Sequence, residues 1–494
     1  MTASKPSVSV TSREPPDGPE PPPAGAAEVP PPATPADPML QAIEHRTVEL
    51  GSEIFGLMKA TAGGTLRRRA AERVESGLLR LLMGDERLRV SLLRFVDVFP
   101  ALGGPAEIAE HLREYLREPV PARRRGSTRA ALARRALGSP WAPDWATARA
   151  GRWAITMLGR RFIAGRTPEE VAPRIRTLER QGFRFTLDLL GESVTSEAQA
   201  DRFAARYREM VDGLARLLGP MPPQAPDGAD DPRVNISIKL SSLASHFDPL
   251  DEEGTAAGVL ARLRPLARAA RAGGVFLNID MEKREYRDLT LRLARRLLEA
   301  PEWAGYPHVG IVMQAYLVDA EPTLTAWLDW VRARRRSMTI RLVKGAYWDS
   351  EQIGAAQNGW PCPVLTEKSR TDAQFERMTR RLLQEHGLVR TAVGSHNVRS
   401  IAHALALAES LHVPPDRLEI QLLYGMADPL ARALRAFGHR PRIYVPCGEL
   451  IPGMAYLVRR ILENTAQESF LRQRALGETD EADLLRDPKL ECAS

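Results

Sequence analysis

The chain has 494 residues, of which 44% are hydrophobic and 27% are charged, and its formal net charge is +7. This composition indicates a soluble globular protein, and the length predicts one large domain with a smaller one. The sequence contains three cysteines and no CxxC pair, which argues against a disulfide scaffold and a structural zinc site and favours a reducing compartment. No apolar run reaches the roughly 18 residues of a membrane-spanning helix, and no signal-peptide pattern opens the chain, so we expect a cytoplasmic protein.

Much of the positive charge comes from three arginine clusters, at residues 67–69, 123–125 and 334–336. Such clusters can bind nucleic acid or anionic lipid. Because no nucleic-acid motif accompanies them, we interpret them as solvated helix faces and expect no nucleic-acid partner.

Two segments precede the region richest in strand patterns. Residues 1–38 are rich in proline and contain no aromatic residue, so they cannot bury enough apolar surface to fold, and we predict a disordered tail. Residues 39–150 carry leucines at three- and four-residue steps, as at Leu78, Leu81 and Leu82. This spacing predicts a helical arm domain that caps the rest of the protein.

From residue 151 to 475, short hydrophobic runs alternate with amphipathic stretches of helical length. Near-continuous hydrophobic runs are typical of parallel strands that are covered on both faces. The predicted strands are residues 183–187, 234–240, 275–280, 309–314, 338–343, 391–395, 418–422 and 442–445. Helical stretches lie between them, among them residues 256–272, 289–298, 373–384 and 401–411. The alternation predicts a (β/α)8 barrel, followed by a C-terminal tail over residues 476–494. A doubly wound sheet is the alternative, but no GxGxxG follows a predicted strand.

Polar residues gather at the ends of the predicted strands. They are Asp188, Lys239, Asp280, Gln314, Arg341, Lys344, His396, Gln421 and Tyr444. Each could simply begin a loop, and a histidine is often structural, but together they predict a polar mouth where barrels of this class hold their active sites. The cations suit a carboxylate, phosphates or a reduced flavin, while Asp280 and Gln314 suit the polar edge of a heterocycle.

The segment 456–464 (YLVRRILEN) predicts a helix beyond the last strand. Arg459 and Glu463 are four residues apart and could form an ordinary surface ion pair. Arg459 and Arg460 could equally clamp a substrate carboxylate, and the charge pattern does not decide between these readings. HExxH, Walker A, GxSxG and Cys/His cluster motifs are absent, so the sequence lacks the usual signatures of zinc, nucleotide and serine hydrolases, and we expect no metal site.

Several motifs resemble the proline dehydrogenase family, and most closely the proline dehydrogenase half of bacterial bifunctional proline-utilisation proteins. The similar segments are NISIKLS (235–241), NID (278–280), QAY (314–316), IRLVKGAYWD (340–349), SHN (395–397) and YLVRR (456–460). The likeness runs from about residue 70 to 475, with the motifs in family order.

The resemblance implies FAD-dependent oxidation of L-proline to Δ1-pyrroline-5-carboxylate, the first step of proline catabolism to glutamate. It implies non-covalently bound FAD and electron transfer to a membrane quinone. Peripheral contact with the inner face of the cytoplasmic membrane would be compatible with that transfer. A separate pyrroline-5-carboxylate dehydrogenase would consume the product. The alternatives are a flavin dehydrogenase of another cyclic amine, such as 4-hydroxyproline, and a non-catalytic barrel that binds a ligand.

The resemblance also implies roles for individual residues. Asp280 and Arg341 would be catalytic, beside the substrate and the flavin. The substrate would be held by Lys239, Arg459, Arg460, Tyr444 and Leu423. FAD would be held by Met281, Gln314, Val343, Lys344, Gly345, Trp348, Thr366, Ser395, His396, Gln421 and Glu463. Tyr424 stands where the family often has histidine, and no ribbon-helix-helix pattern supports DNA binding.

Overall fold

The computed structural model describes residues 38–61, 90–91, 94–96, 98–117, 139, 141–191, 194–219, 231–303, 305–449, 453, 456 and 480–488. The chain divides into two units, Met1–Gln41 and Ala42–Ser494. The described residues of the first unit are the opening residues of helix α1 (Pro38–Ala60). Residues 1–37 of the predicted disordered tail lie outside the described residues, and Pro38, the last residue of that prediction, begins α1.

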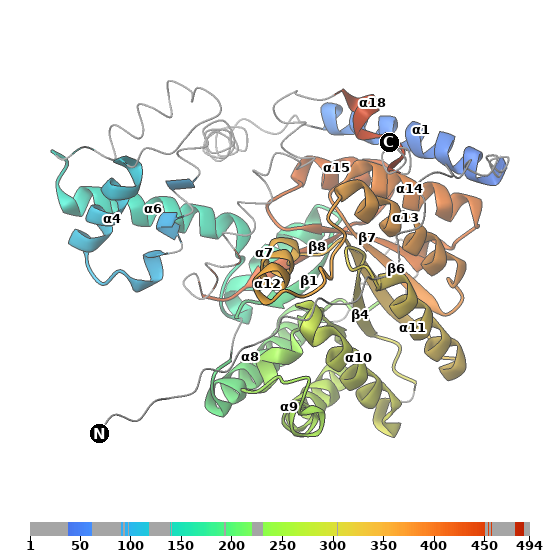
Figure 1. Cartoon of the computed structure of the whole chain (residues 1–494), viewed down its shortest axis with the longest axis horizontal. Coiled ribbons are helices and arrows are strands. Elements are labelled where there is room, and N and C mark those ends of the chain that lie inside the picture. Colours follow the sequence, from blue (N-terminus) through green and yellow to red (C-terminus); the bar gives the residue numbers. More distant parts are fainter. Residues whose placement is uncertain are drawn as a thin grey trace, which may run out of the picture. The chain divides into compact units, whose positions relative to one another are not determined.

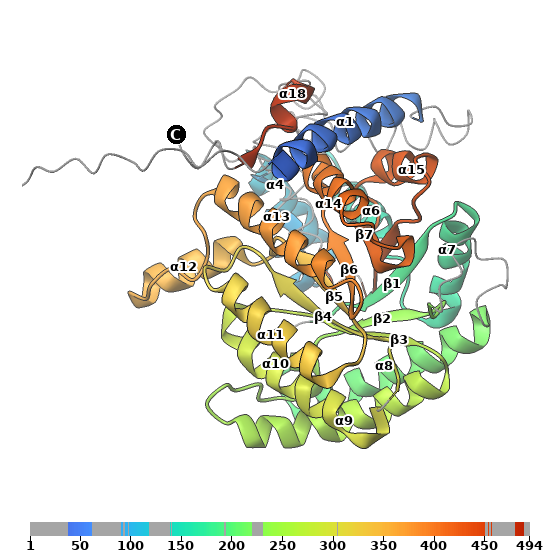
Figure 2. The ribbon, with the colours of Figure 1, turned by 90° about the vertical axis from the view of Figure 1, so that its right-hand side faces the viewer.

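Parallel strands close into a barrel in sequence order, β1 to β8 (Figures 1 and 2). They are β1 (Arg184–Leu189), β2 (Asn235–Ile238), β3 (Phe276–Ile279), β4 (Val309–Gln314), β5 (Met338–Val343), β6 (Val389–Gly394), β7 (Leu418–Leu423) and β8 (Arg442–Cys447). Pairing of β1 with β8, with Arg184 opposite Arg442, completes the ring. The predicted (β/α)8 barrel is confirmed, and all eight predicted strands are present.

Helices surround the barrel between the strands (Figure 2). They are α7 (Pro168–Arg180), α8 (Glu197–Leu218), α9 (Glu252–Ala272), α10 (Arg284–Glu299), α11 (Ala320–Arg334), α12 (Trp348–Asn358), α13 (Lys368–Gln384), α14 (Val398–Ser410) and α15 (Asp428–Ala436). Several start at side-chain caps, as where Ser196 accepts a hydrogen bond from the backbone N–H of Gln199. Three of the four predicted helical stretches lie within observed helices, and the fourth, residues 401–411, extends one residue beyond α14.

Alternation along each strand separates an outer apolar face from the barrel interior. In β5, Met338, Ile340 and Leu342 are buried, whereas Thr339 and Arg341 line a small cavity inside the barrel. Since successive side chains point to opposite faces of a strand, the apolar residues face the helices and the polar ones face inward. The barrel interior is therefore unusually polar.

The described part of the arm is helical, as expected. Helices α4 (Pro105–Arg117) and α6 (Asp144–Phe162) pack against each other, and apolar residues such as Phe95, Leu112 and Ile155 form their core. The same buried cluster includes Leu190, which follows β1, and Met426, which follows β7. The arm is thus joined by apolar packing to the loops at the C-terminal ends of the barrel strands.

A second attachment joins α1 and the C-terminal helix α18 (Glu481–Leu484) to the outer side of α13 and α14. The Arg399 guanidinium bonds Glu44 of α1 at 2.6 Å, Glu376 of α13 at 2.9 Å and the backbone oxygen of Leu485 at 2.6 Å. Leu485 is 1% exposed and lies against Gly51, where a Cβ would come within 2.4 Å of it. Arg399 therefore binds together three segments that lie far apart in the sequence.

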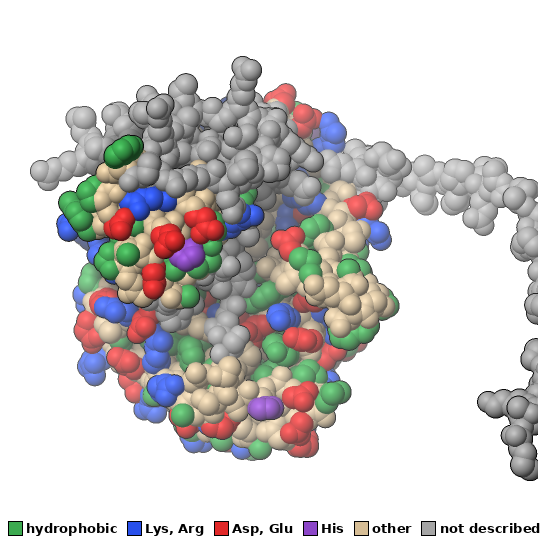
Figure 3. Space-filling model, turned by 60° about the vertical axis from the view of Figure 1, so that its left-hand side comes forward, with side chains coloured by type: hydrophobic (Ala, Val, Ile, Leu, Met, Phe, Trp, Pro, Cys, Tyr) green, Lys and Arg blue, Asp and Glu red, His purple; other side chains and the backbone are tan. Residues whose placement is uncertain are grey.

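The surface shows charges of both signs. On the face in Figure 3, basic and acidic side chains of the described residues are interspersed. In the arginine cluster at 334–336, the Arg334 guanidinium lies 5.3 Å from the centroid of the Trp330 ring, and Arg335 ends α11 in the left-handed conformation. The clusters at 67–69 and 123–125 lie outside the described residues. None of the helices in the described ranges combines the length and apolar character needed to cross a membrane.

Candidate active site

Inward-facing polar residues converge at the C-terminal ends of the barrel strands. Lys239 directly follows β2, and Asp280 directly follows β3. Arg341 lies within β5, as the sequence predicted, and β8 runs on to Cys447 rather than ending at residue 445. Tyr444 is therefore in the middle of its strand, which corrects its predicted place at the strand end.

Asp280 is the centre of this group. Its Oδ1 accepts hydrogen bonds of 2.8 Å from Arg341 Nη1 and of 2.8 Å from Asn278 Nδ2. Its Oδ2 accepts a 2.8 Å bond from the Tyr444 hydroxyl. Burial, followed by the charges of Asp188 and Asp280, raises the pKa of Tyr444 well above its ordinary value, so the phenol keeps the proton that it donates.

Arg341 is held in one orientation by strands on three sides. Its Nη1 bonds Asp280, its Nη2 donates to Ser237 Oγ at 3.2 Å, and its Cζ lies 5.2 Å from the centroid of the Tyr444 ring. The side chain is 5% exposed. A fixed guanidinium in a nearly dry site can stabilise negative charge without reorganising, which is a useful property for an electron-transfer reaction.

Lys239 forms a buried ion pair with Asp188 of β1, and the two side chains are 9% and 3% exposed. The Lys239 backbone N–H also donates to the Tyr207 hydroxyl at 3.2 Å. Burial lowers the pKa of Lys239, but Asp188, Tyr207 and Asp280 outweigh burial and hold that pKa well above its ordinary value. The ammonium is therefore cationic, and Asp188 occupies only part of its donor capacity of three N–H groups.

Gln314 and Gly345 shape one side of the mouth. Gln314 Nε2 donates to the backbone oxygen of Glu282 at 3.0 Å, while its Oε1 is buried and has no hydrogen-bond partner among the described residues. Gly345 has φ +145°, and a Cβ there would approach the Tyr316 ring to 2.4 Å. Only glycine fits this position, because both the backbone conformation and the close contact exclude a side chain.

Lys344 and Trp348 follow the end of β5. Lys344 Nζ lies 2.5 Å from Asp372 Oδ1 of α13, and burial lowers the pKa of Lys344 despite this partner. Trp348 Nε1 donates to the backbone oxygen of Leu365 at 2.8 Å, and the side chain remains partly exposed. The ion pair therefore fixes the position of the Lys344 side chain, and the hydrogen bond fixes that of Trp348.

The predicted site residues of β6 lie at its end, where α14 begins. The Leu423 backbone N–H donates to His396 Nε2 at 2.9 Å, so this ring nitrogen acts as an acceptor. Ser395 Oγ accepts from the Asn397 backbone N–H at 3.1 Å. The α14 start is therefore tied to the end of β7.

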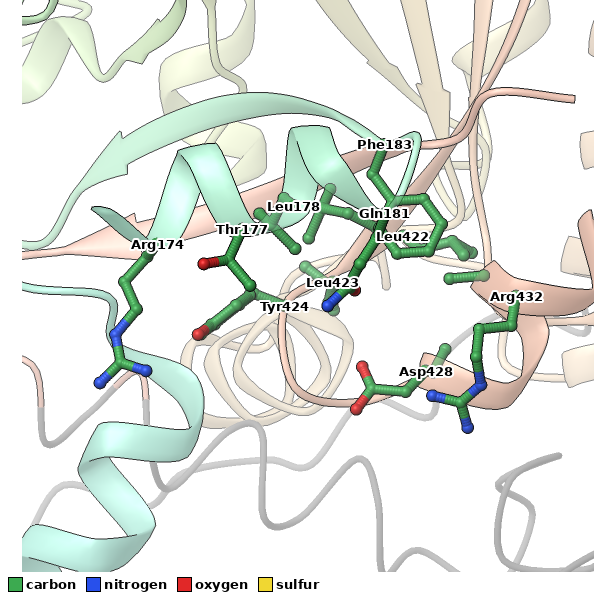
Figure 4. A pocket seen from close by; sticks show the side chains of 13 residues that line it. Arg174, Thr177, Leu178, Gln181, Phe183, Leu422, Leu423, Tyr424, Asp428 and Arg432 are labelled. Atoms are coloured by element: carbon green, nitrogen blue, oxygen red, sulfur yellow. The ribbon is translucent and has the colours of Figure 1, made fainter. Parts of the chain in front are cut away.

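The other predicted residues have different surroundings. Gln421 is buried inside the barrel, where its Nε2 donates to Glu419 Oε1 at 2.6 Å. Leu423, together with Tyr424, lines a cavity of about 180 Å³ between α7 and α15 (Figure 4). Met281 is buried, Val343 is half-buried and Thr366 is exposed. Arg459, Arg460 and Glu463 lie outside the described residues.

The sequence interpretation missed Tyr207, Ser237 and Asn278, which the structure brings into contact with predicted site residues, and it named Asp188 only as a polar residue at a strand end. Strand parity could have found two of the missed residues. Ser237 and Asn278 each lie two residues before a predicted site residue, Lys239 and Asp280, so they share its face. Tyr207 is on α8, and its contact with Lys239 has no local signal.

This fold and site define a (β/α)8 barrel whose mouth holds buried cations and carboxylates in contact. A family described as "Proline dehydrogenase" matches residues 171–473, and one described as "Proline utilization A N-terminal domain" matches residues 44–162. The chain belongs to the proline dehydrogenase family.

Individual relatives agree with this assignment. The bifunctional protein PutA of Escherichia coli is 33% identical over 342 residues, which are 68% of this chain and 25% of that protein. The proline dehydrogenase of Deinococcus radiodurans is 31% identical over 65% of this chain and 90% of its own length. A crystal structure of proline utilization A from Bdellovibrio bacteriovorus is similar with a TM-score of 0.79 and 34% identity, over 90% of this chain and 44% of that one. This chain thus spans about a quarter of the length of the E. coli protein.

Proposed function

We propose that this protein oxidises L-proline to Δ1-pyrroline-5-carboxylate with bound FAD. The observation that carries the proposal is the buried contact of Arg341, Asp280 and Tyr444, which come from three different strands. Such a group of ionised and hydrogen-bonding residues is costly to bury without a function. Family membership supplies the substrate class, since relatives matched over most of their length are named proline dehydrogenases.

The described residues fit a flavin. The buried Gln314 Oε1 is an acceptor without a protein partner in the described ranges, and it suits the N–H of a heterocycle edge. Because Gly345 has no side chain, a flavin could approach its backbone closely. Lys344 offers a cation for ribityl or phosphate oxygens. Val343, Met281, Trp348, Thr366, Ser395, His396 and Glu463 complete the set that we expect to hold FAD. When bound, FAD would supply the two-electron acceptor for the hydride that leaves proline C5.

Charge balance supports a role for the two arginines beyond β8. Within the described residues, the cations Lys239 and Arg341 are offset by the carboxylates Asp188 and Asp280. A substrate carboxylate in this mouth needs further positive charge, and Arg459 and Arg460 would supply it. Together with Lys239 they would clamp the carboxylate and leave the ring of proline facing Tyr444 and Leu423.

The chain's residues then have distinct tasks during oxidation. The carboxylate clamp fixes the orientation of the ring, so that C5 faces the electron acceptor while the amine loses its proton. Arg341 stabilises the negative charge that arrives on the acceptor side. Asp280 keeps the Arg341 and Tyr444 side chains in fixed orientations through its hydrogen bonds. The Tyr444 ring limits the space beside the substrate ring. The net change is loss of a hydride from C5 and of a proton from nitrogen, which forms the imine.

The proposal extends to partners that the family resemblance implies. Electrons would leave to a membrane quinone, which requires peripheral contact with the inner face of the cytoplasmic membrane. A pyrroline-5-carboxylate dehydrogenase would consume the imine product. Both partners are tested separately from the half-reaction with proline, by reoxidation of the reduced protein with a soluble quinone and by coupled turnover.

The decisive experiment is anaerobic addition of L-proline to the purified protein. We expect a flavin absorbance spectrum that bleaches with proline, together with an imine product trapped by o-aminobenzaldehyde. N-Propargylglycine, which inactivated the Bdellovibrio relative, has a carboxylate beside a secondary amine and should inactivate this protein too. A colourless protein, or a flavin that trans-4-hydroxyproline reduces faster than proline, would contradict the proposal.

A further inference from the structure

A buried ion network fills the barrel near the N-terminal ends of the strands. Arg442 holds Glu419 through two hydrogen bonds of 2.8 Å, from Nε to Oε1 and from Nη2 to Oε2. The same Nη2 donates to Asp231 at 2.7 Å. Arg442 is 1% exposed and Glu419 is 7% exposed, so the network is shielded from solvent.

This network dictates how the Gln421 amide is oriented. Burial would raise the pKa of Glu419, but Arg442, Arg390 and Arg184 hold it far below its ordinary value, so the carboxylate is ionised and only accepts. Gln421 must therefore present its NH₂ group to Glu419, as the 2.6 Å contact from Nε2 to Oε1 shows. The amide oxygen is turned away from the network.

Gln421 also lines a small cavity inside the barrel. Gln421 and Arg341 both line a space of about 10 Å³ inside the barrel, beside Arg390. Gln421 Oε1, Arg341 Nε and Arg390 Nε are buried and have no hydrogen-bond partner among the described residues. Buried polar atoms are nearly always hydrogen-bonded, and here the three residues that carry one such acceptor and two such donors line the same cavity.

We propose that this cavity binds one ordered water molecule, which bridges Arg341 Nε and Gln421 Oε1. A cavity of about 10–15 Å³ is the smallest that holds a water, and the water needs two to four polar partners, which this lining offers. Gln421 is then a positioning residue for Arg341, and not a contact of the cofactor as the sequence suggested.

The bridge completes the fixation of the Arg341 guanidinium. Nη1 is held by Asp280, Nη2 by Ser237, and Nε through the water by Gln421, which Glu419 and Arg442 hold in turn. The catalytic consequence rests on the proposed function of Arg341 beside a flavin, whereas the water site itself does not.

The first test is a crystal structure of the full chain, purified with whatever cofactor it retains, at a resolution that defines waters. We expect a well-ordered water within hydrogen-bond distance of both Arg341 Nε and Gln421 Oε1. No density in the cavity, or a direct contact that closes it, overturns the proposal. This result is independent of whether proline is the substrate, and of whether any variant folds.

The second test compares Gln421→Met with Thr391→Val. Gln421→Met keeps the side-chain length but removes both amide contacts. Thr391 is also buried, and its hydroxyl has no partner in the described ranges. It follows Arg390 on β6 and therefore lies on the outer face of that strand, so Thr391→Val is the matched control. Rates of anaerobic flavin reduction, KM for proline, flavin content and the reduction potential of the bound flavin are measured for both.

We expect Gln421→Met to reduce flavin about tenfold more slowly at saturating proline, with KM changed less than about twofold. Its flavin content should match wild type, and its potential should become more negative because Arg341 stabilises the reduced form less well. Thr391→Val should behave as wild type. Unchanged rate and potential in Gln421→Met overturn the positioning role, and loss of flavin from that variant would make Gln421 a cofactor contact instead. A wild-type protein that proline does not reduce refutes the proposed function, and the crystallographic test still decides the water site.

Discussion

The Tyr444 hydroxyl donates to Asp280 Oδ2 at 2.8 Å and so connects β8 with β3 across the barrel mouth. The same carboxylate holds Arg341 through its other oxygen, and the Arg341 guanidinium lies over the Tyr444 ring. The three side chains therefore form a closed triangle, in which a change at one alters the orientation of the other two.

The Tyr444 ring should determine the substrate preference, and the Tyr444 hydroxyl should keep the Asp280 carboxylate in its orientation. Tyr444→Phe loses one hydrogen bond to a carboxylate, and kcat/KM for proline should fall roughly three- to tenfold. Tyr444→Ser also loses packing worth about 1–3 kcal/mol, so the preference for proline over trans-4-hydroxyproline should shrink. Kinetics with both substrates at matched flavin content measure these effects. An unchanged preference in Tyr444→Ser would exclude the ring from specificity.

Arg459→Met and Arg460→Met, made separately, should weaken proline binding. Each removes a charge-assisted contact worth about 1.5–3 kcal/mol, so KM for proline should rise about ten- to a hundredfold. Flavin content, read from the absorbance ratio, should stay as in wild type. If both variants bind proline normally, the carboxylate is held elsewhere, and Lys239 becomes the first candidate.

The pH dependence of proline binding should shift in Asp188→Asn. In wild type, burial lowers the pKa of Lys239, but its neighbours, Asp188 first among them, raise that pKa by more than burial lowers it. The ammonium therefore stays charged through the neutral and mildly alkaline range. Because a lysine is cationic below its pKa, removal of Asp188 lets burial lower that pKa, and KM should start to rise at a lower pH. A KM profile from roughly pH 6 to pH 10 tests this, with Glu197→Gln as a surface control. Superimposed profiles for wild type and Asp188→Asn would show that Lys239 does not bind the carboxylate.

Arg399→Met should destabilise the whole fold. The substitution leaves Glu376, which is 3% exposed, as a buried carboxylate without its main partner, and breaking such a pair costs about 3–5 kcal/mol. Arg46→Met is the control on the same side of α14, because Arg46 and Glu409 are 37% and 50% exposed and their pair should contribute less than about 1 kcal/mol. Urea denaturation of both variants gives the comparison. Equal losses would mean that Arg399 is not a principal attachment of α1 and α18.

The sequence predicted the strands of the barrel more reliably than it predicted where each strand ends. The hydrophobic runs gave the barrel and the order of its strands, because parallel strands covered by helices must be apolar on the outside. Strand ends were less certain, since a pairing partner decides how far a strand continues. Pairing of Leu189 with Cys447 extends β8 beyond its predicted end, so Tyr444 lies in the middle of the strand and not at its end.

The sequence by itself determined which residue types reach the mouth, because period-two alternation and polar strand ends are local properties of the chain. It also determined the family, through motifs that keep their order. Only the tertiary structure decided which of these residues touch: that Lys239 pairs with Asp188, that Gln421 faces Glu419 inside the barrel, and that Arg399 reaches Glu44, 355 residues away. Closing the barrel brings side chains from distant strands within a few ångströms, and burial then forces each charge to find a partner, which no local pattern encodes.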